Sequence, residues 1–196
     1  VGRENYNAIV PALDIIAAFG PFAAFVRTSG MVGSNAITTP GSFSKATLDG
    51  LLSISLPQDV NLLVRSTAQY AQLRDPLPSS ERFSLGGFFR LRGYPSDYFT
   101  GAQGAYVSGE ISRPFAVSVA GGLQLKPFAM VEYGGVKDLV LNPQRGRFGT
   151  SAGGGVDIVL DQGTLRLAYA APLTRTPREE NRAGPTFYFS FSVTNF

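Results

Sequence analysis

The sequence has no cysteine and no histidine, and only 16% of its 196 residues are charged. Without these two residue types the chain cannot form a disulfide, a thiolate or imidazole metal site, or a catalytic pair built on histidine. Globular domains contain about 25% charged residues, so the low charge predicts a surface that water does not cover completely. The 17 basic and 14 acidic residues give a net charge of +3 and are scattered, which predicts no nucleic-acid partner.

No segment is predicted to be a transmembrane helix or a signal peptide. A membrane helix needs about 20 apolar residues, and the one long apolar run, Ala8–Val26, is interrupted by Pro11, Asp14 and the Gly20-Pro21 pair. Two short strands around a Gly-Pro turn explain this run better. The chain opens Val-Gly-Arg-Glu without the apolar stretch of a secretory leader, so we expect a piece of a longer protein.

Glycine, proline, phenylalanine and tyrosine are abundant, and apolar residues alternate with polar ones along most of the chain. From Lys45 to Leu56 the even-numbered residues are apolar or glycine and the odd-numbered ones are mostly polar. A period of two is typical of a β-strand, so we predict an all-β fold. The pattern predicts about eight or nine strands, centred near Ile9–Ala17, Phe22–Arg27, Lys45–Leu56, Val60–Gln72, Ala105–Ser112, Pro127–Tyr133, Gly153–Leu160, Thr164–Ala170 and Phe187–Thr194.

Such alternation fits either a soluble sandwich or a membrane barrel, and three features favour the barrel. The polar positions carry Asp, Glu, Lys and Arg, as a water-filled lumen requires, and Asp14 is expected to face that lumen. Several strands have about 10 residues or more, enough to cross a bilayer at a tilt. Aromatic residues lie near predicted strand ends, as in an interfacial girdle: Tyr70, Tyr94, Tyr98, Phe99, Tyr133, Phe187 and Phe196.

The longest interval without alternation runs over about residues 73–104, which we call the plug loop. A connection of this length is usually functional or disordered, and its many phenylalanine, leucine and tyrosine residues argue against disorder. We therefore expect the plug loop to pack against another part of the protein.

Four short motifs in and after the plug loop resemble one known family. They are Phe83-Ser84-Leu85-Gly86-Gly87, Leu91-Arg92-Gly93-Tyr94, Gly101-Ala102-Gln103-Gly104 and Ser108-Gly109-Glu110-Ile111. The chain is similar over Phe43–Phe196 to the barrel of two-partner-secretion transporters of the TpsB, haemolysin-activator type, within the BamA-like outer-membrane superfamily. The resemblance implies a transmembrane antiparallel β-barrel of the bacterial outer membrane, with a long extracellular loop folded into the lumen.

The resemblance also implies how the chain is divided. Residues 1–196 would form the C-terminal portion of a barrel of about 16 strands, an even number as in other bacterial barrels. The first strands and the N-terminal periplasmic domains, which would recognise the partner, are expected to precede Val1.

In this family the arginine of an Arg-Gly-Phe/Tyr tip meets an acidic residue on the inner barrel wall. Carried over, the plug-loop latch would comprise Arg92, Gly93, Tyr94 and Glu132, with Glu110 also in the lumen. Glu132 stands where the family usually has aspartate, and Ala102 where it often has aspartate.

The base of the loop would comprise Phe83, Gly86, Gly87, Gly101 and Gly104. The C-terminal strand, with Phe187, Phe189, Phe191 and Phe196, would be the signal for insertion by the barrel-assembly machinery.

The function implied is a translocation pore that exports an unfolded partner polypeptide of haemolysin or adhesin type, without enzymatic activity and without a cofactor. Its other contacts would be outer-membrane lipids. A BamA-like insertase is one alternative and a passive porin-like barrel a second.

Gly153-Gly154-Gly155 lacks the Gly-Lys-Ser of a phosphate loop and fits a strand or turn with close neighbours. A glycosidase-like pair of Glu110 and Glu132 has no other feature of a sugar site beside it.

Overall fold

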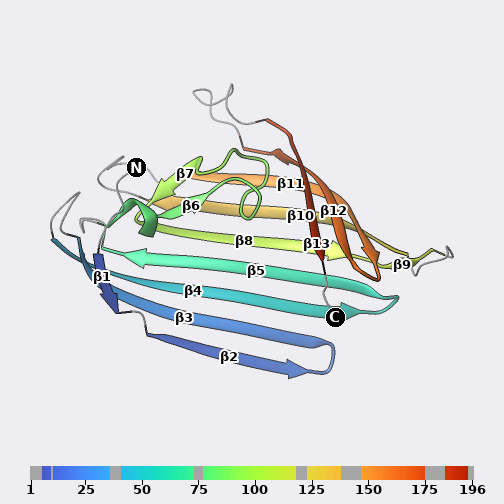
Figure 1. Ribbon diagram of the computed structural model, residues 1–196, viewed down its shortest axis with the longest axis horizontal. Coiled ribbons are helices and arrows are strands. Elements are labelled where there is room, and N and C mark those ends of the chain that lie inside the picture. Colours follow the sequence, from blue (N-terminus) through green and yellow to red (C-terminus); the bar gives the residue numbers. More distant parts are fainter. Residues whose placement is uncertain are drawn as a thin grey trace.

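The computed structural model describes residues 6–9, 11–35, 41–72, 77–117, 123–137, 147–174 and 184–193. These residues form an 11-stranded sheet in the order β1-β3-β4-β5-β8-β10-β11-β12-β13, with β2 paired to β3 and β9 to β10, and a separate β6-β7 pair (Figure 1). The elements are β1 (Tyr6–Ile9), β2 (Ala12–Phe19), β3 (Phe22–Asn35), β4 (Gly41–Leu56), β5 (Val60–Ala71), η1 (Ser79–Glu81), β6 (Phe83–Leu85), β7 (Phe99–Gly101), β8 (Gln103–Ser112), β9 (Phe115–Ala116), β10 (Gln124–Lys137), β11 (Arg147–Leu160), β12 (Gly163–Pro172) and β13 (Thr186–Val193).

The fold is all-β and every strand pair is antiparallel, as predicted. Each predicted strand corresponds to a strand of the large sheet. Four of them are longer than the alternating segment predicted, because their ladders continue past it: β3, β10 and β11 have 14 residues and β4 has 16. Within the described ranges, no helix is long and apolar enough for a membrane span.

Pro11 explains why β1 and β2 are separate. Both pair with β3 in one continuous register, from Tyr6 opposite Asn35 to Phe19 opposite Phe22. Proline has no N–H to donate to the ladder, but the Pro11 carbonyl still accepts the Gly30 N–H at 3.0 Å. The predicted Gly20-Pro21 turn joins β2 to β3, and Gly20 has a φ of +55° there.

The two ends of the large sheet differ in their connections (Figure 1). At one end, short turns join β2 to β3, β4 to β5 and β11 to β12, and a longer connection that contains β9 joins β8 to β10. At the other end lie longer connections, among them the plug loop between β5 and β8. Bacterial membrane barrels have short periplasmic turns and longer extracellular loops. We call these two ends the turn end and the loop end.

The charged residues of the strands share one face of the sheet. Directly opposite residues of neighbouring strands point to the same side, and one such row is Asp14, Arg27, Asp49, Thr67 and Tyr106. The plug loop lies on this side, which we call the inner face. Lys137, at the loop end of β10, faces the other side. The remaining charged strand residues with described side chains all face inward: Asp14, Arg27, Lys45, Asp49, Arg65, Glu110, Lys126, Glu132, Arg147, Asp157 and Arg166.

The outer face is apolar. One of its rows runs Phe22, Ile54, Leu62, Ile111 across four strands, and many of its large side chains are exposed. Lys137, at the loop end of β10, is the one charged strand residue with a described side chain on this face, and such a face of exposed apolar side chains fits contact with hydrocarbon. The strands that the structure describes curve around the plug loop without closing, because β1/β2 and β13 lie at opposite edges of the sheet (Figure 1).

The predicted aromatic girdle is only partly correct. Tyr70, Tyr133 and Phe187 are exposed on the outer face. Tyr94 and Phe99 are instead buried in the plug loop, and Tyr98 packs beside them. They fall near strand ends in the sequence because the loop begins and ends there, but the loop folds back and carries them inward. Phe196 lies outside the described residues.

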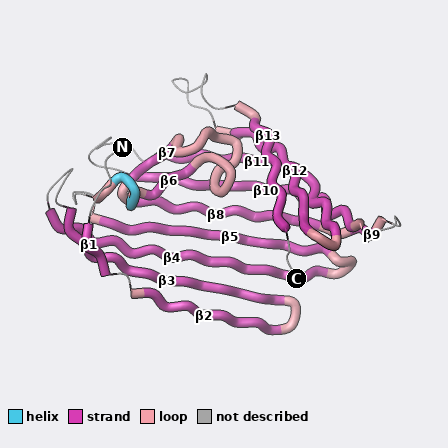
Figure 2. The backbone as a smooth tube through the Cα atoms, in the orientation of Figure 1, coloured by secondary structure: helices cyan, strands magenta, loops and turns pink. Residues whose placement is uncertain are grey.

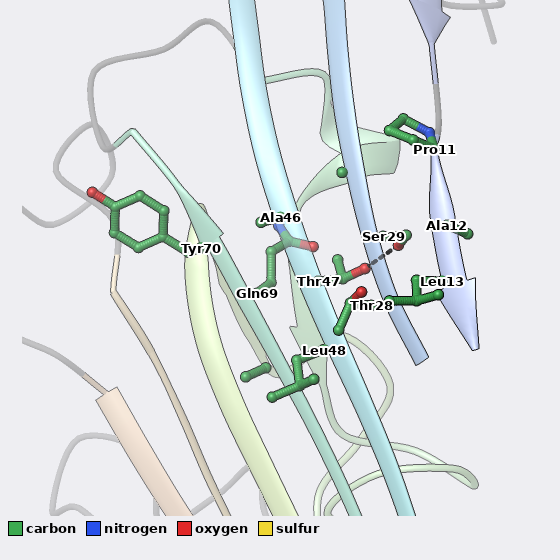
Figure 3. A pocket seen from close by; sticks show the side chains of 12 residues that line it. Pro11, Ala12, Leu13, Thr28, Ser29, Ala46, Thr47, Leu48, Gln69 and Tyr70 are labelled. Atoms are coloured by element: carbon green, nitrogen blue, oxygen red, sulfur yellow. Dashed lines mark hydrogen bonds between the residues drawn. The ribbon is translucent and has the colours of Figure 1, made fainter. Parts of the chain in front are cut away.

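A shallow hollow of about 630 Å³ marks the outer face near the loop end. Figure 3 shows Leu13, Thr28 and Leu48, which stand opposite one another on β2, β3 and β4, along its floor. The small residues Gly30, Ala46 and Ala68 leave the space, and no ionisable carboxylate or amine lines it. The charged residues of the strands lie instead mainly on the inner face, beside the plug loop.

The two faces predict opposite responses to a new charge. Leu52 and Ser53 are neighbours on β4, with Leu52 on the outer and Ser53 on the inner face. In the full-length protein, Leu52→Arg should lower the free energy of unfolding from lipid vesicles by about 2–4 kcal/mol, the cost of arginine on a lipid face. Ser53→Arg should change it little. Equal losses in urea titrations of the two variants would contradict the assignment of the faces.

Candidate functional site

The plug loop packs on the inner face of the sheet through a small core of its own. Between β6 and β7 its chain crosses over the middle strands (Figure 2). The core combines loop residues with two wall residues, Tyr106 of β8 and Val136 of β10, and its buried members are Phe83, Leu85, Leu91, Tyr94, Phe99, Tyr106 and Val136. The loop is therefore fixed to the wall by buried apolar contacts, as its composition predicted.

Glycines of the wall make room for this core. A Cβ on Gly134 would lie 2.9 Å from the Leu85 side chain, and one on Gly149 would lie 2.8 Å from the Phe99 ring. A Cβ on Gly104 would overlap the Phe83 ring. Gly134 and Gly149 stand opposite each other on β10 and β11, so the wall is thinnest where the loop rings approach it. Sequence reasoning found Gly104 but missed the other two.

The tip of the plug loop is a tight turn. Gly86 and Gly87 have φ values of +115° and +88°, which only glycine adopts readily. The Gly86 N–H donates to the Arg90 carbonyl at 2.9 Å, and the Gly87 N–H donates to the Tyr94 carbonyl at 2.8 Å. These bonds close the segment that carries Arg92.

The structure brings Arg92 and Glu132 together. The Arg92 Nε donates to Glu132 Oε1 at 3.0 Å, and the Arg92 backbone N–H donates to Glu132 Oε2 at 2.6 Å. Arg92 is 6% exposed and Glu132 1%. One carboxylate therefore holds both the side chain and the backbone of the loop tip, which fixes the orientation of the tip as well as its position.

The wall completes the shell of the Glu132 carboxylate. The Tyr106 hydroxyl donates to Oε1 at 2.6 Å, and the Ser151 hydroxyl donates to Oε2 at 2.7 Å. Each oxygen thus accepts two hydrogen bonds, which offset the cost of burying the charge. Burial by itself lowers the pKa of the Arg92 guanidinium, but the attraction and hydrogen bond of Glu132 raise this pKa above its ordinary value. Arg92 therefore stays charged.

A second ion-pair layer lies on the turn-end side of Glu132. The Arg166 guanidinium donates to Glu110 at 2.6 Å and approaches Asp157 at 3.3 Å. Arg92 also approaches Glu110, at 3.8 Å, so the two layers are joined. Arg166 lies over the Phe128 ring, 3.9 Å from its centroid. Sequence reasoning included Glu110 but missed Arg166 and Asp157, although both occupy inner positions of alternating strands.

Gly93 and Tyr94 attach the tip to the far wall. A Cβ on Gly93 would lie 2.5 Å from the Pro172 nitrogen, so the loop backbone rests against the end of β12. The Tyr94 hydroxyl donates to the Thr174 carbonyl at 2.5 Å. The Tyr188 hydroxyl, on β13, donates to the Arg92 carbonyl. The tip therefore touches β10, β12 and β13.

The base of the plug loop is held where the loop leaves and rejoins the sheet. The Gln69 side chain donates to the Glu81 carbonyl at 2.9 Å and to the Ala102 carbonyl at 3.1 Å, bridging the two ends. Lys45 forms a 2.5 Å ion pair with Glu81. A Cβ on Gly101 would lie 2.8 Å from the Lys137 carbonyl, so this glycine allows a close approach to β10. Gln69 and Lys45 were not among the predicted site residues.

The remaining predicted residues lie elsewhere. Phe187, Phe189 and Phe191 are exposed on the outer face of β13, away from the plug loop, and Phe196 lies outside the described residues. Gly153, Gly154 and Gly155 are inside β11, closely packed against the backbones of β10 and β12. Among the residues that the structure describes, no cluster of three or more metal-ligating side chains occurs. The arrangement of the inner face is suited to holding a loop in place.

Comparisons with known proteins place the chain among secretion proteins. Residues 20–158 match the family described as haemolysin secretion/activation protein ShlB/FhaC/HecB. The structure superposes on CdiB from Escherichia coli with a TM-score of 0.82 and 19% identity, over 97% of this chain and 37% of CdiB. CdiB from Acinetobacter baumannii gives 0.74 and 17%, over 95% and 33%. The chain thus spans about a third of these structures and shares their fold. No curated protein matches the sequence significantly.

The glycine-lined wall yields a matched test on one strand. A Cβ at Gly104 of β8 would overlap the Phe83 ring, whereas one at Gly109 would find no atom closer than 4.0 Å. In the full-length protein, Gly104→Ala should destabilise the packed plug loop by about 1–3 kcal/mol, a usual cost of overpacking. Limited proteolysis within the loop should be faster for Gly104→Ala and unchanged for Gly109→Ala. Equal cleavage rates would contradict the packing described.

The hydroxyl of Tyr106 should matter because it bonds a buried charge. Tyr106→Phe removes one of the four hydrogen bonds of Glu132, and a bond to a charged group contributes about 1.5–3 kcal/mol. Protection of the plug-loop amides from hydrogen exchange should fall accordingly. Tyr133→Phe, which alters an exposed tyrosine on the outer face, is the control and should leave protection unchanged. Unaltered exchange in Tyr106→Phe would show that this bond contributes little.

Proposed function

Because this chain belongs to the haemolysin secretion/activation protein family ShlB/FhaC/HecB, we propose that it forms the C-terminal portion of a pore that exports an unfolded partner polypeptide of haemolysin or adhesin type. The protein resides in the bacterial outer membrane. Export fits the inner face, where the charged residues of the strands face a path that water can fill. The chain has the fold of the CdiB structures.

The observation that carries the proposal is the buried carboxylate of Glu132, which holds the plug loop across the inner face. A passive porin needs no such contact, because an open channel conducts without a loop fixed by buried charges. A pore for polypeptides must be closed when no partner is present. The plug loop, led by Arg92, would supply this closure and would return to it after each export event. The family description names secretion, which favours export over an insertase.

The energetics of opening follow from the contacts of the tip. Separating Arg92 from Glu132 leaves a buried charge without its partner, which costs about 3–5 kcal/mol. This cost keeps the pore closed to polypeptides at rest, but interactions with an entering polypeptide can offset it. Export of this kind requires no catalytic step and no bound nucleotide. The partner would enter from the turn end, which corresponds to the periplasmic side of a bacterial barrel.

The outer face has two further roles in this proposal. Its apolar rows would contact outer-membrane lipids. The exposed phenylalanines of β13 are, we propose, part of the signal by which the barrel-assembly machinery recognises and inserts the protein. Each is separated from the next by one inward residue, so a partner that binds an extended strand could contact all three from one side.

Removing the charge of Glu132 tests the closure. In the full-length protein, Glu132→Gln replaces one oxygen by an NH₂ group that faces N–H and O–H donors, so the tip should detach. Single-channel conductance in planar bilayers should rise several-fold, and secretion of the partner should fall because the plug loop no longer returns to its site. Asp14→Asn is the control, since it removes an inner-face carboxylate from an exposed pair with Arg27, and such pairs contribute about 0–1 kcal/mol. A conductance that is the same in both variants would contradict the proposal.

A further inference from the structure

A cavity of about 280 Å³ lies beside the tip of the plug loop. The loop contributes Phe88, Phe89 and Arg92, and three strands on two sides of the curved wall supply the rest: Arg65 of β5, Arg166 and Ala168 of β12, and Tyr188 and Ser190 of β13. Arg166 and Ser190 stand in the row of Lys126, on the turn-end side of Glu132. Arg65 stands in the row of Glu132, so the cavity extends from that row toward the turn end, the side from which the partner is proposed to enter.

The lining of this cavity is cationic. It includes three arginines and no carboxylate. Two of these arginines are paired with carboxylates that are not part of the lining: Arg92 pairs with Glu132, and Arg166 pairs with Glu110. Arg65 differs, because in the described part of the chain no carboxylate forms an ion pair with it, although it faces the same inner space. The cavity therefore presents a guanidinium that is available to an incoming anion.

The cavity also presents an apolar ring to water. Phe89 is 83% exposed, whereas the neighbouring large apolar residues of the loop, such as Phe83 and Leu85, are buried in its core. Phe88 holds the group together through edge contacts with Phe89 at 5.1 Å and with Tyr188 at 5.6 Å between ring centroids. Arginine and aromatic side chains side by side are the residues that dominate binding of polypeptides. The packing of the loop does not account for the exposure of Phe89.

We propose that this cavity binds acidic side chains flanked by apolar ones in the polypeptide being exported, with Arg65 pairing the carboxylate and Phe89 contacting the apolar neighbour. The inference rests on the proposed export function. The volume holds one or two side chains, less than the several hundred Å³ of a small-molecule pocket. An entering chain would thus be held by one or two of its side chains while the plug loop is still in place.

Current block by synthetic peptides tests the binding directly. The full-length protein is reconstituted in a planar bilayer, and unstructured peptides that alternate Asp-Phe with Gly-Ser are added on the turn-end side. Their counterparts carry Lys in place of Asp. The acidic peptide should block the current for about tenfold longer than the lysine peptide, since a charge-assisted hydrogen bond is strong enough to give such a ratio. Equal block times for the two peptides would overturn the proposal.

Substitutions then assign the contacts. Arg65→Glu should abolish the preference for the acidic peptide, while Arg65→Lys should keep most of it. Phe89→Ser should shorten the block by both peptides, while Phe89→Tyr should not. The matched control is Phe19→Ser, which alters a ring of similar exposure, 85%, on the outer face. A preference that survives Arg65→Glu, or a loss as large in Phe19→Ser as in Phe89→Ser, would contradict the site.

Secretion in cells separates this inference from the function on which it rests. If the unaltered protein exports no partner polypeptide, the proposed function fails whatever the peptides do. The other case is that the unaltered protein exports its partner, and that Arg65→Glu and Phe89→Ser export it equally well and show unchanged block times. The export function would then be correct and the proposed binding site wrong.

Discussion

The arrangement of the inner face depends on one buried carboxylate. Glu132 is buried on the wall, and it accepts hydrogen bonds from the Arg92 side chain, the Arg92 backbone, Tyr106 and Ser151. A charge in such a place is tolerated only with its full set of partners. The wall supplies two of the four bonds and the plug loop the other two. The loop and the wall are therefore each incomplete without the other.

Other features of the chain serve this contact. Wall glycines such as Gly134 and Gly149 let the loop rings approach the strands, and Gly86 and Gly87 allow the turn that orients Arg92. The outer face carries most of the apolar strand residues, so the charged residues of the strands gather on the inner face beside the plug loop. A loop held by charge and by packing together is stable at rest, yet it has one point at which a competitor for the charge can release it. That combination suits a pore that must stay closed between export events.

The sequence predicted the sheet well because a period of two is a strong signal. The alternation along β4, β5 and β8 showed which residues of each strand share a face. The Gly20-Pro21 pair predicted the turn between β2 and β3. The tip at Arg92 and its contact with Glu132 came from a family resemblance, since no periodicity links residues 40 positions apart. Tyr106 and Ser151, the partners of Glu132, and Arg166, the partner of Glu110, were missed because each looks like an ordinary inward residue until the strand register places it beside a carboxylate. The girdle prediction for Tyr94 and Phe99 was wrong for a related reason, because the alternation does not show that the loop folds back and carries them inside. The family resemblance alone placed Tyr94 in the lumen.

The most direct test of the central claim is the hydrogen exchange of the Arg92 backbone amide in the full-length protein. We expect this amide to be strongly protected in the unaltered protein. When Glu132 is replaced by glutamine, this amide and the amides of residues 83–101 should lose their protection together, because one carboxylate holds the tip and the rest of the loop follows the tip. Protection that persists across these residues in the variant would show that packing alone holds the plug loop, and would contradict the role assigned to Glu132.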